Sequence, residues 1–184
     1  MRFIIQGDLF WPDGVIRPGV LVINGRQVES IGDSLPAPSD PADTLLSVPA
    51  GGVAAPGYID LQINGAFGHD FTTYPDLVVA VARYLPRFGV TAFLPTLLST
   101  PLERYQVATA TVKSLADEPE TARILGLHLI GPYLNPAQAG GHSVHYLRRP
   151  ARNELVYLDE QIVRLVTLAP EQVGRMVAAL PTRR

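Results

Sequence analysis

The spacing of apolar and polar residues changes character along the chain. Residues 2–32 predict short strands separated by turns, because "WPDG" at 11–14 interrupts the apolar runs and Asn24-Gly25 suits a two-residue hairpin turn. Residues 33–44 are rich in proline, serine and aspartate without periodicity, which predicts a loop or linker. The first part of the chain is therefore expected to form short strands, two of them joined by a hairpin turn, followed by a loop.

From residue 53 onward, strand patterns alternate with helix patterns. Strands are predicted in "VAAPGYIDLQING", "VTAFLPTLLS", "ARILGLHLIG" and "QIVRLVTLAP", and helices in "PDLVVAVARYLPRFG", "PLERYQVATATVKSLAD" and "PEQVGRMVAAL". Pro86 is expected to end or kink the first helix early, and Gly89 is its candidate C-cap. A long loop follows the third strand, with a short helix expected at 154–161. The alternation predicts βαβ units and a parallel sheet.

The first strand of this series has a polar side. Strict alternation in "YIDLQIN" places Ile59, Leu61 and Ile63 on one side and Asp60, Gln62 and Asn64 on the other. Polar side chains are costly to bury unless they meet solvent or a ligand. We therefore expect the polar side to face the interior of a (β/α) barrel near the carboxyl ends of its strands, where active sites lie. A surface strand with one solvated face is the alternative.

The third strand, in "LGLHLIGPYLN" at 125–135, repeats this arrangement. Its leucines share one face, and His128 and Ile130 share the other, so that His128 is expected to look into the same space as Gln62 and Asn64. A histidine in such a place is either a ligand-binding group or a hydrogen-bonded core residue. The isoleucine beside it is unexpected, because a side chain that faces a binding cavity is usually polar.

Composition narrows the class of protein and its partners. The 184 residues suffice for one domain of ordinary size. The net charge of −2 gives no reason to expect a nucleic-acid partner, and the absence of cysteine excludes disulfides, thiolate metal sites and cysteine nucleophiles. Neither a signal peptide nor a membrane-spanning stretch is recognisable in the sequence, so a cytoplasmic protein without a membrane partner is expected.

Three further groups of polar residues have two readings each. His142 and His145 have the spacing of a metal pair, but they lie in a glycine-rich loop without a nearby carboxylate. Loop arginines could bind a phosphate or could pair with nearby carboxylates: Arg148, Arg149 and Arg152. His69 and Asp70, after the first strand, suit either a ligand contact or an ordinary turn.

Several segments together resemble one family. "PGYIDLQING", "TAFLPTLLST", "GLHLIGPYLN", "GGHSVHYLRRP" and "VTLAPE" are similar, in this order and spacing, to segments of the N-acetylglucosamine-6-phosphate deacetylases of the amidohydrolase superfamily. The resemblance implies an α/β protein: the first half of a (β/α)8 TIM-like barrel preceded by strands of a small β-sandwich. Residues 1–50 would be part of the sandwich domain, and residues 51–184 would form about four β/α units.

The same resemblance implies a chemistry and a set of site residues. The family hydrolyses the N-acetyl amide of GlcNAc-6-phosphate with a bound divalent metal, zinc or similar, which activates water. Gln62 and Asn64 match the branch in which Gln-x-Asn has replaced His-x-His, which implies one metal rather than two. The histidine that contacts the substrate corresponds to His142. We therefore expect His142, Gln62, Asn64 and His128 to bind an amino-sugar phosphate.

The chain departs from the family pattern at the metal site. Ile130 stands where the family has its metal-binding glutamate, and an alkyl side chain cannot ligate a cation. The two histidine ligands and the catalytic aspartate of the family would fall on strands that follow Arg184. We expect a truncated member that binds no metal and is inactive alone, with no catalytic residue retained.

Other readings remain open. The chain is either a degenerate deacetylase, a non-catalytic module that binds amino-sugar phosphates, or one half of a hydrolase completed by a separate C-terminal half. Four strands cannot close a barrel, so two copies could instead pair as half-barrels in a homodimer. A dihydroorotase-like enzyme is disfavoured, because such enzymes keep His-x-His where this chain has Gln62 and Asn64.

Overall fold

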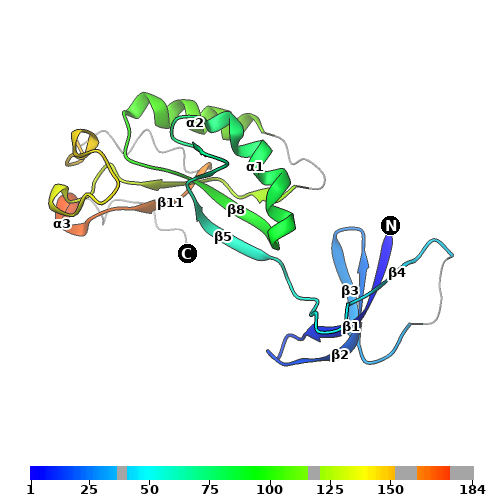
Figure 1. Ribbon diagram of the computed structural model, residues 1–184. Coiled ribbons are helices and arrows are strands. Elements are labelled where there is room, and N and C mark those ends of the chain that lie inside the picture. Colours follow the sequence, from blue (N-terminus) through cyan, green and yellow to red (C-terminus); the bar gives the residue numbers. More distant parts are fainter. Residues whose placement is uncertain (37–40, 116–120, 152–160, 175–184) are drawn as a thin grey trace. The chain divides into compact units, whose positions relative to one another are not determined.

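The computed structural model describes residues 1–36, 41–115, 121–151 and 161–174 (Figure 1). The chain divides into two compact units, Met1–Pro56 and Gly57–Arg184. Residues 154–160 of the helix expected at 154–161 and the end of the expected last helix lie outside the described residues, as does Arg152. No helix in the part that the structure describes is long and apolar enough to cross a membrane.

The first unit is a four-stranded sheet with the order β3-β2-β1-β4. Its strands are β1 (Arg2–Phe10), β2 (Ile16–Asn24), β3 (Gln27–Gly32) and β4 (Thr44–Ser47). The expected hairpin is confirmed, but its register places Asn24 opposite Gln27, so the two turn residues are Gly25 and Arg26. Gly25 has a φ of 58°, a left-handed conformation that glycine adopts without strain.

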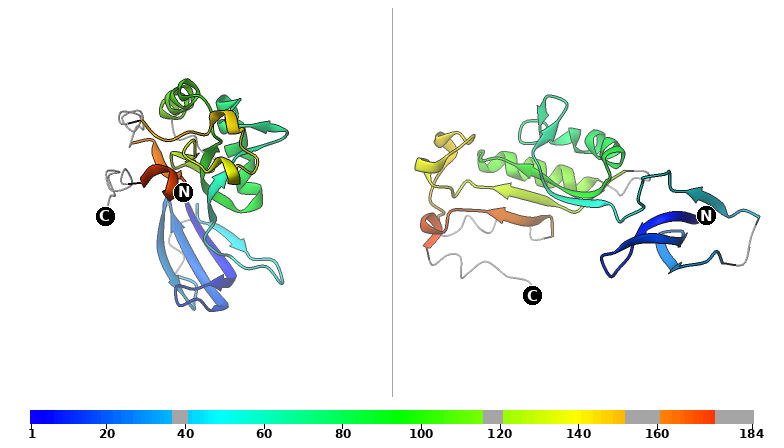
Figure 2. Two further views of the ribbon diagram at one scale, coloured as in Figure 1. Left: turned by 90° about the vertical axis from the view of Figure 1, so that its left-hand side faces the viewer. Right: turned by 60° about the horizontal axis from the view of Figure 1, so that its bottom comes forward.

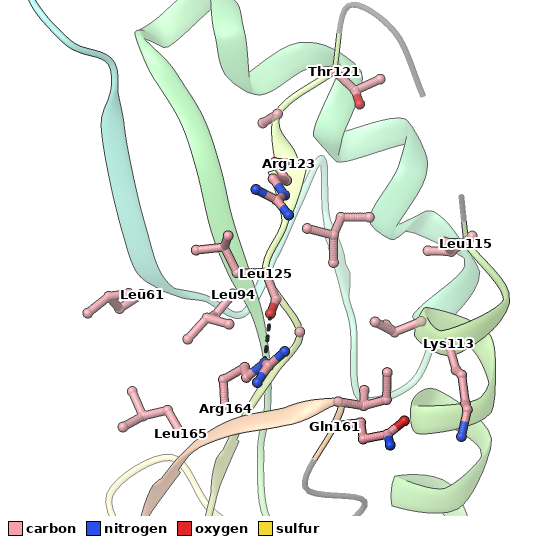
Figure 3. Close-up of a pocket in the computed structure, with 15 residues that line it drawn as sticks. Leu61, Leu94, Lys113, Leu115, Thr121, Arg123, Leu125, Gln161, Arg164 and Leu165 are labelled. Atoms are coloured by element: carbon pink, nitrogen blue, oxygen red, sulfur yellow. Dashed lines mark hydrogen bonds between the residues drawn. The ribbon is translucent and has the colours of Figure 1, made fainter. Parts of the chain in front are cut away.

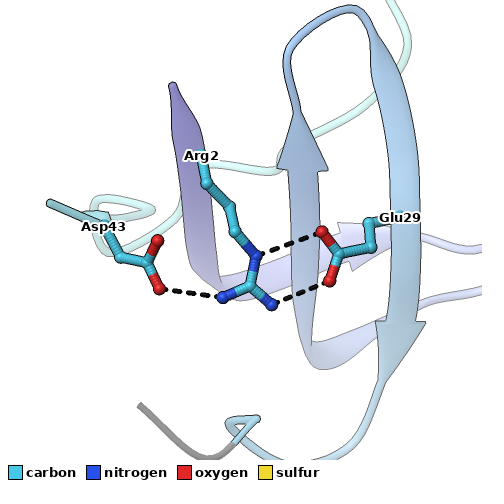
Figure 4. Close-up of polar contacts among 3 residues, drawn as sticks. All are labelled: Arg2, Glu29 and Asp43. Atoms are coloured by element: carbon cyan, nitrogen blue, oxygen red, sulfur yellow. Dashed lines mark hydrogen bonds and ion pairs between the residues drawn. The ribbon is translucent and has the colours of Figure 1, made fainter. Parts of the chain in front are cut away.

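Arg2 connects three segments of this sheet. Its guanidinium donates to both carboxylate oxygens of Glu29, at 3.1 and 2.8 Å, and to Asp43 Oδ2 at 2.8 Å (Figure 4). The bond from Arg2 lowers the pKa of the Glu29 carboxyl. The apolar side chains of Ile4, Val20 and Val22 form the small core of the unit.

The second unit is built on a parallel sheet with the order β11-β10-β8-β5. The strands of this path are β5 (Tyr58–Ile63), β8 (Val90–Leu97), β10 (Leu127–Ile130) and β11 (Val163–Thr167). Shorter strands are β6 (Gly65–Ala66), β7 (His69–Asp70) and β9 (Arg123–Ile124), and the helices are α1 (Val78–Tyr84), α2 (Leu102–Ser114) and α3 (Pro170–Val173). Alternating parallel strands and helices confirm the expected βαβ units and the α/β fold class.

Helices α1 and α2 cover one face of this sheet (Figure 2). The main core lies between them and the strands, and it contains Val78, Val81, Ala82, Phe93, Leu97, Tyr105, Ala108, Val112, Leu127 and Leu129. Helix α1 ends at Tyr84, and Pro86 lies in the 3-10 turn that follows it, which confirms the expected early end. Gly89 caps that turn with a φ of 78°.

Strand β5 departs from the strict alternation that the sequence predicted. Its pairing with β8 shifts register between Tyr58 and Ile59 and again between Asp60 and Ile63. Ile63 packs against the helix-side core, whereas Ile59 and Leu61 are 63% and 53% exposed. The predicted alternation, with all three apolar residues on one side, is therefore wrong for this strand, because a shift in register breaks the two-residue period.

The third predicted strand is also interrupted. It divides into β9 and β10 at Gly126, whose φ is 130°. A Cβ at this position would collide with the carbonyl oxygen of Ile162, directly before β11. Only glycine therefore allows the two segments to approach so closely.

Candidate functional site

His128 lies at the centre of the parallel sheet. It belongs to β10 and is 2% exposed. Its Nδ1 lies 3.0 Å from the carbonyl oxygen of Leu61 in β5, and its Nε2 lies 2.8 Å from Thr167 Oγ1 in β11. Thr96 Oγ1 of β8 is a longer neighbour of Nδ1, at 3.4 Å. The imidazole of this β10 residue thus makes two short hydrogen bonds, one to β5 and one to β11, and has a longer contact with β8.

These partners determine which ring nitrogen of His128 carries the proton. A carbonyl oxygen only accepts, so Nδ1–H is the donor to Leu61, and Nε2 accepts from the hydroxyl of Thr167. Burial lowers the pKa of His128, against a smaller rise from the bond to Leu61. The ring is therefore neutral, and both of its nitrogens are engaged within the protein.

His142 follows β10 in the long loop and meets the end of β8. The main-chain N–H of Ser99 donates to His142 Nδ1 at 3.1 Å, and Ser99 Oγ lies 2.8 Å from the same nitrogen. Burial lowers the pKa of His142. In the part of the chain that the structure describes, Nε2 of His142 has no hydrogen-bond partner. His142 therefore differs from His128 in having one ring nitrogen left for a ligand.

A polar cavity of about 290 Å³ lies beside His142. Its walls come from the segments after β7, β8 and β10, which meet at the carboxyl end of the sheet. The polar lining residues are Asp70, Thr72, Thr73, Ser99, Thr100, Arg104, His142, Ser143 and Tyr146. Thr72 Oγ1 accepts from the main-chain N–H of Leu98 at 2.9 Å, which ties the loop after β7 to the end of β8.

A larger cavity of about 670 Å³ lies at the other end of the strands (Figure 3). Leu61, Leu94 and Leu165 line one part of it, and Arg123 and Arg164 lie between them and helix α2. Arg164 donates through Nε to the carbonyl oxygen of Leu125 at 3.3 Å. Sites in parallel β/α folds are built at the carboxyl ends of the strands. The smaller cavity beside His142 is therefore the candidate functional site.

Gln62 is the residue before the last in β5, and Asn64 directly follows β5. Gln62 is exposed, and Asn64 is half-buried. The side-chain amide nitrogen Nδ2 of Asn64 is buried and has no hydrogen-bond partner among the described residues. The main-chain carbonyl oxygen of Asn64 accepts from the main-chain N–H of Phe71 at 2.9 Å. A buried donor without a partner is uncommon in native proteins. Neither residue lines the cavity beside His142.

The residues present do not fit the metal site that the resemblance implies. The side chain of Ile130 offers no lone pair, and both nitrogens of His128 are engaged. Within the described ranges, no group of three or more histidine, aspartate or glutamate residues could hold a metal ion. No metal-dependent step is therefore assigned to these residues.

The remaining candidate residues have different surroundings. His145 is exposed, and its ring meets the ring of Tyr146 edge-on, with 5.4 Å between the ring centroids. No feature of His145 favours a metal pair with His142. The ring of His69 packs edge-on against the ring of Tyr74, with 5.3 Å between the ring centroids. Asp70 accepts a hydrogen bond from the main-chain N–H of Thr73 at 2.9 Å and lines the cavity. Arg148 and Arg149 are not among the cavity-lining residues.

Sequence reasoning missed Ser99, Thr72 and Arg104. Ser99 lies in the quoted segment "TAFLPTLLST", where its only signal was its place directly after a buried strand. Its contact with His142 joins residues that are 43 positions apart, and no local pattern encodes such a contact.

Comparison with known proteins gives a consistent result. The chain is 39% identical over 145 residues to the N-acetylglucosamine-6-phosphate deacetylase of Homo sapiens, a match that covers 72% of this chain and 35% of the human protein. It is 36% identical over 137 residues to the N-acetylgalactosamine-6-phosphate deacetylase of Shewanella sp. (strain ANA-3), covering 70% of this chain and 34% of that protein. No family model matches the sequence.

A solved structure agrees with the sequence matches. It is a mutant N-acetyl-D-glucosamine-6-phosphate deacetylase from Mycobacterium smegmatis in complex with N-acetyl-D-glucosamine-6-phosphate, with a TM-score of 0.74 at 28% identity. The match covers 96% of this chain and 46% of that one. The chain thus spans about a third of the length of these curated relatives and just under half of the solved one. By sequence and by fold, the chain belongs to the N-acetylglucosamine-6-phosphate deacetylase family.

Proposed function

We propose that this chain forms the part of an amino-sugar-phosphate site that contains His142, and that it binds such a ligand without hydrolysing it. The observation that carries the proposal is the position of His142. Its ring is held by Ser99 in the wall of a polar cavity, and its Nε2 is available to a ligand. The resemblance assigns a substrate contact to this residue, and the solved relative holds N-acetyl-D-glucosamine-6-phosphate.

Asn64, directly after β5, supports the presence of a ligand. Its buried Nδ2 is a donor without a partner among the described residues, and an oxygen of a sugar or an amide would supply the missing acceptor. Gln62 is the second amide of this strand and is exposed to solvent. His128, whose two nitrogens are engaged, would act beneath these groups by fixing the strands that carry them.

The absence of hydrolysis rests on Ile130. Amidohydrolases generally use a divalent metal, zinc or similar, to activate water, and the resemblance places a metal-binding glutamate at this position. Isoleucine lacks the carboxylate of a glutamate, which would offer a metal two oxygen ligands and a negative charge. A chain with isoleucine at this position would therefore recognise the amino-sugar phosphate and leave its N-acetyl group intact.

Isothermal titration calorimetry tests binding directly. GlcNAc-6-phosphate and GalNAc-6-phosphate, the substrates named for two relatives, are each titrated into the whole chain. The variant His142→Ala should lower the affinity for the tighter-binding ligand by about tenfold, because a hydrogen bond to the ligand is lost. This change is equivalent to about 1.4 kcal/mol. His145→Ala is the matched control, since this histidine is exposed. Equal affinities for the wild type and His142→Ala would refute the proposed site.

Acetate release tests the second half of the proposal. The wild type, with zinc and either sugar phosphate, should release no acetate above the uncatalysed rate. Turnover by the wild type that is abolished by a chelator would show that the chain is a working hydrolase and that Ile130 does not prevent metal binding.

We further propose that the sheet of the second unit is completed by further β/α units, supplied by a second copy of the chain or by a separate C-terminal half. Strands β5 and β11 form the edges of the described sheet, and Tyr58, Ile59 and Leu61 on β5 are 72%, 63% and 53% exposed. Unpaired apolar edges favour association. Sedimentation of the purified chain should show a dimer, or a monomer that is recruited by an added C-terminal half. A monomer unaffected by that half would overturn the proposal.

A further inference from the structure

Ser99 presents two hydrogen-bond donors to one atom of His142. Its main-chain N–H lies 3.1 Å from Nδ1, and its hydroxyl oxygen lies 2.8 Å from the same nitrogen. A main-chain N–H can only donate, so Nδ1 must be the acceptor and carries no proton. In a neutral imidazole the proton then resides on Nε2, which becomes a donor.

We infer that Ser99 is a positioning residue that fixes His142 in the Nε2–H tautomer and so selects ligands that present an acceptor oxygen to this ring. The inference rests on the proposed function for the identity of the ligand, but not for the state of the ring. The ligand atom facing Nε2 would be a hydroxyl, carbonyl or phosphate oxygen, and an amine or a metal ion would be rejected. A metal on Nε2 would require the proton to move to Nδ1, where it would face the N–H of Ser99.

The surroundings of Ser99 hold it in place. Ser99 is 5% exposed. The carbonyl oxygen of Ile130, at 3.3 Å, competes with His142 Nδ1, at 2.8 Å, for the single proton of the Ser99 hydroxyl, and we assign this proton to the shorter contact. A Cβ at Gly131 would collide with Ser99 Oγ, so the glycine at this position leaves the space that the hydroxyl occupies. On the other side, the main-chain N–H of Leu98 donates to Thr72 Oγ1 at 2.9 Å. The donors are therefore fixed before any ligand arrives.

The two inward histidines hold opposite tautomers. His128 carries its proton on Nδ1 because a carbonyl oxygen accepts from it, while Ser99 keeps the proton of His142 on Nε2. The chain uses the first ring to connect strands and leaves the donor of the second ring for a ligand. This division of roles depends on the neighbours of each ring, not on the residue type.

The tautomer is measured by long-range proton–nitrogen NMR correlations of the imidazole rings in the ligand-free, full-length chain near neutral pH. The expected spectrum shows His142 protonated on Nε2 and unprotonated on Nδ1. In Ser99→Ala, which keeps the amide and loses the hydroxyl, a detectable fraction of the Nδ1–H form should appear. Ser143→Ala is the matched control, because this serine lines the same cavity without a hydrogen bond to His142 in the described structure. Addition of zinc should leave the His142 nitrogen signals in place.

Ligand titration tests whether the tautomer of His142 matters for recognition. Ser99→Ala should lower the affinity for the sugar phosphate severalfold. Ser143→Ala should leave the tautomer of His142 unchanged. A wild-type His142 protonated on Nδ1, or a Ser99→Ala variant with unchanged ring signals and affinity, would overturn the inference. If the ring signals behave as expected but no sugar phosphate binds, the proposed function fails and the assignment of the tautomer stands.

Discussion

Replacing His128 by phenylalanine separates its hydrogen bonds from its packing. Phenylalanine keeps an aromatic ring in the buried site and loses the bonds to Leu61 and Thr167, at 3.0 and 2.8 Å. Each such bond contributes about 1 kcal/mol, and the 3.4 Å approach of Thr96 is too long to count. We expect His128→Phe to lower the free energy of unfolding by about 2 kcal/mol.

The alanine variant measures the packing as well. His128→Ala removes the same bonds and also leaves a cavity between β5, β8 and β11, which costs about 2–3 kcal/mol more in well-packed cores. The total of about 4–5 kcal/mol is a large share of the stability of an ordinary domain. His145→Ala, on the surface, should change stability by less than about 0.5 kcal/mol.

Urea denaturation followed by far-UV circular dichroism provides the measurement. The described helices all belong to the second unit, so the helical signal reports the unit that contains His128, while the fluorescence of Trp11 reports the first unit. The slope of the free energy of unfolding against urea concentration must be equal in all variants for their free energies of unfolding to be compared. A His128→Phe protein as stable as the wild type would refute the structural role and would favour a ligand-binding role, since binding residues are often not optimal for stability.

Three further results are expected. Burial lowers the pKa of His128 and His142, so the unfolded chain takes up protons at these residues at a higher pH than the folded chain does. The contribution of the two histidines to stability should therefore be fully present above about pH 6.5 and decrease as the pH falls below it, as measured by urea denaturation at several pH values. Gly126→Ala should lower the melting temperature strongly, because the new Cβ would collide with a main-chain carbonyl oxygen. Gly141→Ala is the control and should leave the melting temperature nearly unchanged, because no atom lies near the new Cβ. Tyr105→Phe, which removes a buried hydroxyl bonded to a carbonyl oxygen at 3.1 Å, should cost about 1 kcal/mol by urea denaturation.

Local patterns predicted most of the elements of this chain. Hydrophobic alternation, turn dipeptides and the Pro86–Gly89 stop signal act within a few residues, and the structure confirms the hairpin, the early end of α1 and the parallel strands. The prediction failed in β5 because a bulge is a property of strand pairing, which depends on β8. It also failed to divide the third strand at Gly126, because the residue that approaches it closely, Ile162, is distant in the sequence.

The sequence by itself determined the family, the alternation of strands and helices, and the isoleucine at position 130, because each depends only on residue type and order. Tertiary structure decided which histidine has a nitrogen to offer. His128 and His142 have the same chemistry in the sequence, but Leu61 and Thr167 occupy both nitrogens of the first, and Ser99 occupies only Nδ1 of the second. The role of an imidazole follows from the donors and acceptors around it, and these come from segments that are distant in the chain.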